Sequence, residues 1–480
     1  MNNVAKIGFG CYRIDNRIEE HFNALHKAIE SGIRIIDTSA NYCDGRSEIL
    51  IGNVLNDLIG AGKLKREDVM LITKGGYIQG TNYQFAVKKM KNGTPFPEVV
   101  EYEEGLWHCI HPEFLEDQIN RQLHRLDQND GGYIDVYLLH NTEYYLRNAR
   151  KNAYEKEESR IVYYKRIKEA FVYLEEKVKE GKIKYYGISS NTFPLSDAMF
   201  DFTSLEKVYE IAQEIGPDNH FKYIQMPFNL LESEACLNRN QCDNTKTVLE
   251  FAKEKGIKVI TNRPLNAITD KGLVRLADFK SDVFDKAEFL KYLEVVNAIE
   301  DDFLKDAITN LNLSKEEIGF LSNNFVFGRV LESNWQKFGS IEHLNDFIEQ
   351  HLSFKLNNLI DFFDEKISDE YFVQLFDRYM KFVFKILSLI SCYYKEFANK
   401  RSEYFHSLIN DFVPEEVKPM SLSQKALLVV GSAEGVDIVL VGARKEVYVE
   451  DVKSVINTAA LKQYDKILSN ISESVINETE

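Results

Sequence analysis

The chain has 480 residues, 44% of them hydrophobic, which is enough to bury the core of one large domain or of several smaller ones. Its 59 Lys and Arg residues against 75 Asp and Glu residues give a net charge of −16, which disfavours nucleic acid and anionic membranes as general partners. Six cysteines without a CxxC pair, a start without a signal segment and no apolar stretch long enough to span a bilayer predict a reduced, cytoplasmic protein.

Short apolar segments alternate with amphipathic segments from residue 6 to residue 262, a pattern typical of successive βα units and a parallel sheet. Gly32, Gly181 and Gly256 stand where amphipathic segments end, as glycines commonly do after helices. We predict seven strands here, over residues 7–11, 33–38, 69–73, 133–139, 183–188, 223–226 and 257–261. The intervening helices are expected at residues 17–31, 47–58, 112–126, 159–180, 205–215 and 245–255.

The alternation lapses at residues 77–105, which are polar and aromatic without a clear period. We interpret this segment as a long loop. On an enzyme scaffold, such a loop is a candidate for covering the substrate.

A different composition begins at residue 272, where strand signals nearly vanish and helical patterns rich in Phe, Leu, Asp and Lys follow one another. The βα pattern resumes with a helix at 422–430, a strand at 437–441 and a last helix near 448–461. The sequence therefore predicts a (β/α)8 TIM barrel with a large all-helical insertion after strand 7. The expected domains are residues 1–271 with barrel strands 1–7, the insertion at 272–419, and residues 420–480 with the final helix, strand, helix and tail.

Four polar side chains stand at or just after the ends of predicted strands, on the face of the barrel where catalytic groups gather. They are Asp37, Tyr42, Lys74 and His140. A phenol has an ordinary pKa of about 10, and a neighbouring ammonium lowers it while a carboxylate holds the ammonium charged. An imidazole opposite the phenol would orient and polarise a carbonyl oxygen. The set predicts protonation of an oxygen while a hydride reaches the adjacent carbon.

Each of these residues also has a purely structural interpretation. Asp37 alone could cap a helix or a turn, and Lys74 alone could be a surface charge. Four suitable residue types at four suitable places, after three of the strands, favour a genuine site. His108 and His111 lack the spacing of metal ligands, so no metal site is predicted.

The motifs around these residues resemble those of the aldo-keto reductases. The similar segments are Gly8-Phe9-Gly10, Asp37 to Tyr42 followed by Gly45-Arg46-Ser47-Glu48, Thr73-Lys74, residues 134–140 and residues 181–189. The resemblance covers about residues 5–266 and 420–462. It implies a (β/α)8 barrel that binds a nicotinamide cofactor without a Rossmann fold, and the chain has no G-x-G-x-x-G fingerprint after a strand.

The resemblance also implies a role for each site residue. Tyr42 would be the general acid/base, with Lys74 and Asp37 as the pair that tunes it. His140 would orient the carbonyl group. The carboxamide of the nicotinamide would be held by Gln225 and by Ser189 or Ser190 with Asn191.

The chain departs from the family pattern at two places. Asn262-Arg263-Pro264-Leu265 stands where the family commonly has a stacking aromatic before Pro-Leu. Tyr448 and Val452 occupy the positions usual for an arginine at the 2′-phosphate and an asparagine at the adenine, while Arg444 and Lys445 could supply the cation. The remaining expected cofactor residues are therefore Arg263, Leu265, Arg444, Lys445 and Tyr448, for NADP(H) with NAD(H) as the alternative.

The leading hypothesis is an NAD(P)H-dependent oxidoreductase that interconverts an aldehyde or ketone and an alcohol by direct hydride transfer, with a small-molecule carbonyl compound or alcohol as its substrate. The alternative is a catalytically weak NADP(H)-binding sensor or scaffold that uses the helical insertion to bind a protein partner. Because the insertion follows the seventh strand, it could equally be a lid, a substrate platform or an oligomer contact.

Overall fold

The computed structural model describes residues 4–126, 132–270, 272–280, 282–456 and 458–477. The chain divides into two compact units. The barrel unit comprises Met1–Thr269 and Ile409–Glu480, and the helical unit comprises Asp270–Leu408.

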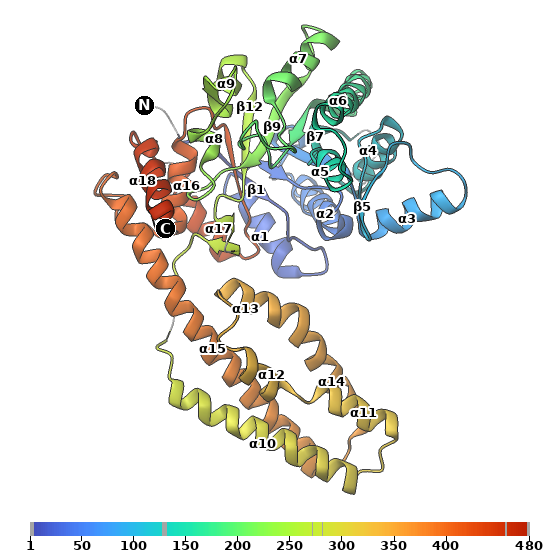
Figure 1. Cartoon of the computed structure of the whole chain (residues 1–480), viewed down its shortest axis with the longest axis vertical. Helices are drawn as coiled ribbons and strands as arrows, with labels where there is room; N and C mark the ends of the chain where they lie inside the picture. The colour runs from blue at the N-terminus through green and yellow to red at the C-terminus, as the bar shows by residue number, and fades with distance from the viewer. Residues whose placement is uncertain (1–3, 127–131, 271, 281, 457, 478–480) are drawn as a thin grey trace. The chain divides into compact units, whose positions relative to one another are not determined.

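Eight parallel strands close into a barrel in the first unit (Figure 1). In spatial order they are β1 (Lys6–Gly10), β2 (Ile35–Asp37), β3 (Met70–Gly75), β7 (Ile134–His140), β8 (Ile183–Ser189), β9 (Phe221–Pro227), β12 (Lys258–Asn262) and β15 (Ile438–Val441). The last strand pairs with the first, with Ile7 beside Val439. Apolar side chains such as Ile72, Val136 and Ile260 form one buried cluster among the strands. The predicted eight-stranded barrel is confirmed.

Each barrel strand leads to a helix that packs outside the barrel (Figure 1). These helices are α1 (Glu19–Glu30), α2 (Arg46–Gly60), α4 (Pro112–Leu126), α6 (Lys156–Lys179), α7 (Leu205–Ile215), α9 (Val248–Lys255), α16 (Leu422–Ser432) and α17 (Glu446–Lys453). Local sequence sets their ends: α9 begins at a capping box of Thr247 and Glu250 and ends at Gly256, which has a φ of +67°. The last helix is shorter than the predicted 448–461, a range in which residue 457 lies outside the described residues.

The barrel unit also contains elements outside the eight strands and the eight helices that follow them. They are α5 (Tyr144–Lys151), α8 (Glu234–Leu237), β10 (Arg239–Gln241), β11 (Lys246–Thr247), β13 (Asn266–Thr269) and α18 (Tyr464–Asn477). Strands β10 and β11 pair with each other in an antiparallel hairpin.

The segment after β3 is structured, so the predicted loop at residues 77–105 is wrong. It contains β4 (Tyr77–Ile78), α3 (Gly80–Lys91) and β5 (Val100–Glu103), followed by β6 (Leu106–His108). The three strands form an antiparallel sheet in the order β4-β6-β5. Only Ala86 of α3 is fully buried, so this helix has no apolar stripe that its sequence could reveal.

The helical unit has a core of its own, which confirms the predicted helical insertion after the seventh strand. Its elements are β14 (Gly272–Arg275), α10 (Lys286–Asn310), α11 (Lys315–Asn324), α12 (Phe327–Asn334), α13 (Ile341–Phe347), α14 (Ser353–Lys366) and α15 (Glu370–Asn410). Stacked aromatic rings fill the core, with Phe363 and Phe376 only 3.8 Å apart between ring centres. None of the described helices combines the length and apolarity that crossing a bilayer requires.

Candidate active site

Two adjacent strands bring an acidic and a basic side chain together at the carboxyl end of the barrel. Asp37 is the last residue of β2, and Lys74 lies near the end of β3. The Lys74 Nζ donates to Asp37 Oδ1 at 2.6 Å and to the carbonyl oxygen of Thr38 at 2.7 Å. Lys74 is 0% exposed and Asp37 is 3% exposed. The pair is therefore a buried ion pair inside the barrel mouth.

Tyr42 is the third hydrogen-bond partner of the Lys74 ammonium. Lys74 Nζ lies 3.3 Å from Tyr42 Oη, so the third donor of the ammonium faces the phenol oxygen. The backbone turns sharply after the tyrosine, with Cys43 and Asp44 at φ values of +48° and +57° before Gly45 at +82°. This turn separates Tyr42 from the start of α2 and presents its ring to the barrel mouth, edge-on to the Tyr12 ring at 5.1 Å.

The buried surroundings shift the pKa values of all three groups. Burial raises the pKa of Asp37 and lowers the pKa of Lys74, while their mutual contact opposes both shifts. Desolvation and the Asp37 charge raise the pKa of the Tyr42 phenol well above its ordinary value. The pKa of Tyr42 is therefore not lowered in the protein alone, contrary to the prediction, because burial of the phenol and then the Asp37 charge raise it. Tyr42 is a neutral phenol that has a proton to give.

His140 ends β7 and faces the same mouth. Its Nδ1 lies 3.0 Å from Ser39 Oγ, and its ring lies 6.0 Å from the Tyr42 ring and 4.7 Å from the Tyr77 ring. Burial, followed by the Lys74 charge, lowers the pKa of His140 well below its ordinary value. The imidazole is therefore neutral near pH 7 and carries a single ring proton.

A second histidine holds the main chain of His140. Because a carbonyl oxygen only accepts, the His108 Nε2–H donates to the His140 oxygen, at 2.7 Å. Gly76 passes beside this contact at a φ of +152°, and a Cβ there would lie 2.7 Å from His108 Nε2 and 2.8 Å from the His140 oxygen. The close approach thus needs glycine. From its sequence context, His108 is expected to pack in the loop or to contact the substrate rather than to bind a metal, and its contact with the main chain of His140 is not predicted.

Gln225 extends the group across the barrel mouth. It donates through Nε2 to Asp37 Oδ2 at 2.8 Å, and its Oε1 accepts from Ser189 Oγ at 3.1 Å and from Asn262 Nδ2 at 3.3 Å. Asp37, Ser189 and Asn262 are the last residues of β2, β8 and β12, and Gln225 lies near the end of β9. Asn262 Oδ1 is buried and accepts no hydrogen bond from the described residues. Asn262 Oδ1 is therefore a hydrogen-bond acceptor, beside Gln225, that is still available to a ligand.

The two serines at the end of β8 face different surroundings. Ser189 contacts Gln225, whereas Ser190 Oγ lies 3.1 Å from Thr192 Oγ1 and 3.3 Å from Thr203 Oγ1. The structure therefore joins Ser189, and not Ser190, to the group around Asp37.

Glu143 is a further buried residue at this edge that sequence analysis missed. Its Oε1 accepts from the Asn191 main-chain N–H at 3.0 Å and from Asn191 Nδ2 at 3.3 Å. A carboxylate only accepts, so the amide nitrogen of Asn191 faces Glu143 and its oxygen points elsewhere. The available signal was an acidic residue three positions after the end of β7.

The remaining predicted cofactor residues lie after β12 and β15, two strands that pair with each other. Arg263, at a φ of +54°, pairs with Glu232 at 2.5 Å, and Lys445 lies 3.3 Å from Glu20. Arg444 is exposed and has no ion pair within the part of the chain that the structure describes. Leu265 is half-buried and Tyr448 is exposed. Of these cations, Arg444 is the one that no carboxylate neutralises.

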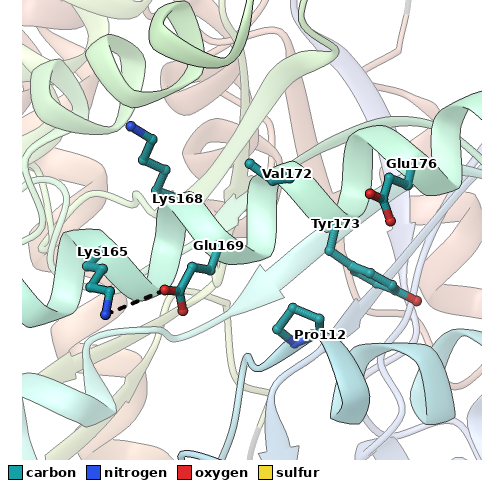
Figure 2. Close-up of a pocket in the computed structure, with 7 residues that line it drawn as sticks. All are labelled: Pro112, Lys165, Lys168, Glu169, Val172, Tyr173 and Glu176. Atoms are coloured by element: carbon teal, nitrogen blue, oxygen red, sulfur yellow. Dashed lines mark ion pairs between the residues drawn. The ribbon is translucent and has the colours of Figure 1, made fainter.

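A separate hollow lies on the outside of the barrel, along α6 (Figure 2). Its volume is about 540 Å³, and its lining consists of Pro112, Lys165, Lys168, Glu169, Val172, Tyr173 and Glu176. Lys165 pairs with Glu169 across one helical turn at 3.7 Å. The hollow shares no residue with the group at the barrel mouth.

Among the described residues, no three His, Cys, Asp or Glu side chains are grouped to hold a metal ion.

Sequence comparison adds a family match. The model of the Aldo/keto reductase family matches residues 6–299, more than half of the chain. The protein named "Uncharacterized oxidoreductase YqkF" of Bacillus subtilis (strain 168) is 26% identical over 187 residues, which are 39% of this chain and 45% of that protein. The chain thus aligns with less than half the length of this relative.

Two solved structures are similar over most of the chain. The aldo-keto reductase AKR11C1 from Bacillus halodurans, in its holo form, is 16% identical, with a TM-score of 0.47 over 98% of this chain and 92% of that one. An aldo/keto reductase from Klebsiella pneumoniae, in complex with NADP and acetate, is 14% identical, with a TM-score of 0.45 over 98% of this chain and 92% of that one.

Proposed function

The chain belongs to the aldo/keto reductase family, and we propose that it interconverts an aldehyde or ketone and an alcohol with a nicotinamide cofactor. The observation that carries this proposal is the contact of Lys74 Nζ with both Asp37 Oδ1 and Tyr42 Oη at the barrel mouth, with His140 beside the phenol. The four side chains supply a proton donor, a charge that stabilises the phenolate left behind, and a second hydrogen-bonding group for an oxygen.

Tyr42 gives the proton in this proposal. Its raised pKa keeps the phenol protonated at neutral pH, so it can donate to a carbonyl oxygen during reduction. As the proton leaves, the Lys74 ammonium at 3.3 Å stabilises the phenolate, and Asp37 keeps Lys74 charged and in place. In the oxidation direction the same phenolate would accept the proton of the alcohol.

The residues around Gln225 fit the carboxamide of a nicotinamide. A carboxamide has two N–H donors and one acceptor, and Asn262 Oδ1 is a buried acceptor without a partner among the described residues. Ser189, Asn191 and Gln225 would hold the group together with Asn262. When bound, the cofactor supplies the hydride.

NADP(H) is the cofactor we propose, because Arg444 is an exposed guanidinium without an ion pair in the described chain. A guanidinium suits a 2′-phosphate through two parallel hydrogen bonds. Arg263 and Lys445 are already paired with Glu232 and Glu20, so they have less charge to offer. Leu265 and Tyr448 would pack along the rest of the nucleotide.

Replacing Tyr42 by Phe tests the proposal. Tyr42→Phe removes the hydroxyl and keeps the ring contacts with Tyr12 and His140, so NADPH binding should persist while carbonyl reduction is lost. Tyr12→Phe is the matched control, since it removes a neighbouring phenol that is not among the hydrogen-bond partners of Lys74 Nζ in the described chain, and it should keep turnover. NADPH binding is followed by fluorescence titration and turnover by the loss of NADPH absorbance with a panel of aldehydes and ketones. Unchanged turnover in Tyr42→Phe contradicts the proposal.

Binding of NADPH by the unaltered protein without turnover of any carbonyl compound would favour the second candidate, a cofactor-binding sensor or scaffold. The observation that speaks for this candidate is Asn262-Arg263 at the end of β12, where the sequence has no aromatic residue before Pro264-Leu265 to stack on a nicotinamide.

A further inference from the structure

A chain of hydrogen bonds connects His140 to the rim of the barrel mouth. Ser39 Oγ lies 3.0 Å from His140 Nδ1 and 2.7 Å from Asn41 Oδ1, and the other end of the Asn41 amide lies 3.0 Å from Gln79 Oε1. Ser39 is 1% exposed and His140 is 7% exposed, so water has little access to the contact between them. Ser39 and Asn41 belong to the turn that follows β2, and Gln79 precedes α3.

The partner of Nδ1 decides what the other ring nitrogen can do. A neutral imidazole has one N–H, and His140 Nε2 has no hydrogen-bond partner among the described residues. If Nδ1 accepts a hydrogen bond, Nε2 carries the proton and can donate to a carbonyl oxygen. If Nδ1 donates, Nε2 is a bare acceptor that cannot bind a carbonyl oxygen.

The Ser39 hydroxyl has a single proton, so it can donate to only one of its three neighbours, His140 Nδ1, Asn41 and the Lys74 carbonyl oxygen at 3.3 Å. The Lys74 oxygen already accepts from Gln122 Nε2 at 3.0 Å and from the Ala40 main-chain N–H at 3.2 Å, so it does not depend on Ser39. The two ends of a carboxamide have the same shape, and its orientation follows from its partners. The geometry therefore permits two directions of the chain. In one, the Gln79 amide donates to Asn41 Oδ1, Asn41 Nδ2 donates to Ser39 Oγ, and Ser39 donates to His140 Nδ1. In the other, which is the direction that the amide atoms have in the structure, His140 Nδ1 donates to Ser39 Oγ, Ser39 donates to Asn41 Oδ1, and Asn41 Nδ2 donates to Gln79 Oε1. The first direction is reached by turning over the two amides.

We propose that Ser39, supported by Asn41 and Gln79, is a positioning residue that holds His140 in the tautomer with its proton on Nε2. In this direction Ser39 donates its hydroxyl proton to His140 Nδ1. His140 Nε2 then carries the N–H, which can donate to the substrate oxygen. The catalytic benefit rests on the proposed carbonyl reduction, whereas the tautomer itself is a property of the folded protein and is measured without turnover.

The tautomer is read by NMR on protein labelled with 15N-histidine. Long-range correlations between ring nitrogens and ring carbon-bound protons distinguish the Nε2–H form, the Nδ1–H form and the imidazolium, and the His140 signals are those that His140→Gln removes. We expect the Nε2–H pattern for His140 near pH 7. An Nδ1–H or imidazolium pattern overturns the proposal, whether or not the protein turns over a carbonyl compound.

Asn41→Asp is the sharpest variant. A carboxylate can only accept, so Ser39 must donate to residue 41, and the His140 proton must move from Nε2 to Nδ1 in order to donate to Ser39. We expect the NMR pattern to change to the neutral Nδ1–H form and kcat/KM for carbonyl reduction to fall about 100-fold, as when one oxyanion donor is removed. NADPH affinity should change little. Retention of the Nε2–H pattern, or conversion to imidazolium, contradicts the relay.

Ser39→Ala and Ser39→Thr separate the hydroxyl from the shape of the side chain. Ser39→Ala removes the group that selects the tautomer, so both neutral forms should appear and kcat should fall about tenfold with KM for NADPH unchanged. Ser39→Thr keeps the hydroxyl and should recover most of the rate and the Nε2–H pattern. Equal losses in the two variants would indicate a packing role instead.

Loss of activity in Tyr42→Phe together with normal activity in Asn41→Asp would leave the proposed reaction standing and reject the relay.

Discussion

The Lys74 ammonium and the Asp37 carboxylate lie 2.6 Å apart, on neighbouring strands, and almost no solvent reaches either side chain. Removing one partner of such a pair leaves a buried charge without compensation. Lys74→Met should therefore lower the free energy of unfolding by about 3–5 kcal/mol, measured by urea denaturation. The double variant Asp37→Asn/Lys74→Met should be more stable than Lys74→Met alone.

The exposed pair of Lys63 with Glu30, at 2.9 Å, is the control for that experiment. Its distance is similar, but both side chains are solvated, so Lys63→Met should change the stability little. A comparable loss in the two single variants would mean that burial of the Lys74 pair does not determine its effect.

Buried neutral histidines make the stability depend on pH. Burial lowers the pKa of His108 to about 4, so the unfolded chain, with a histidine pKa of about 6.5, takes up a proton first as the pH falls. The contribution of His108 is complete above about pH 6.5 and is lost as the pH falls toward about 4. His108→Gln should reduce the fall in the free energy of unfolding between pH 7 and pH 5, measured by urea denaturation. An unaltered slope would contradict this origin.

Gly76 should tolerate no side chain. Gly76→Ala would place a methyl group 2.7 Å from His108 Nε2 and 2.8 Å from the His140 oxygen, so the main chain of His140 must move. We expect a loss of kcat that exceeds the loss of NADPH affinity. Gly93→Ala is the control, since Gly93 also has a positive φ, +75°, but nothing lies within 4 Å of its Cβ position. It should lower stability by about 1 kcal/mol and leave kcat unchanged.

Arg444 should determine the preference between the two nicotinamide cofactors. Arg444→Ala removes a hydrogen-bonding cation, so KM for NADPH should rise on the order of tenfold while KM for NADH stays the same. Lys445→Ala should have a smaller effect, because the Lys445 ammonium lies 3.3 Å from Glu20. Steady-state kinetics with both cofactors measure the difference. Equal changes for NADPH and NADH would show that Arg444 does not contact a 2′-phosphate.

The barrel was predictable from sequence because most of its strands are short apolar segments that end at a polar residue or a glycine. Asp37, Lys74 and His140 could be grouped for the same reason, since parallel strands bring their carboxyl ends to one face. The helix α3 was not predictable, because it buries little and therefore shows no apolar period. The pKa direction of Tyr42 also escaped prediction, since a sequence shows which charges are present and not how far water is excluded.

The contact of Ser39 with His140 joins residues that are 101 positions apart. Neither residue type is unusual at its place, and the distance between their atoms depends on the pairing of β3 with β2 and β7. Glu143 is similar, because its contact with Asn191 requires β7 and β8 to be neighbours in the fold. Such contacts follow from the closed barrel and cannot be obtained from motifs alone.

The position of the insertion also affects how the chain folds during synthesis. The barrel closes only when β15 pairs with both β12 and β1, yet residues 263–437 separate β12 from β15. At a translation rate of about 5–20 residues per second, the ribosome needs on the order of ten seconds or more to make this segment. During that time the first seven strands have two unpaired edges, and exposed strand edges are templates for aggregation. The two edges of the nascent barrel therefore stay open to pairing with other chains until its eighth strand emerges.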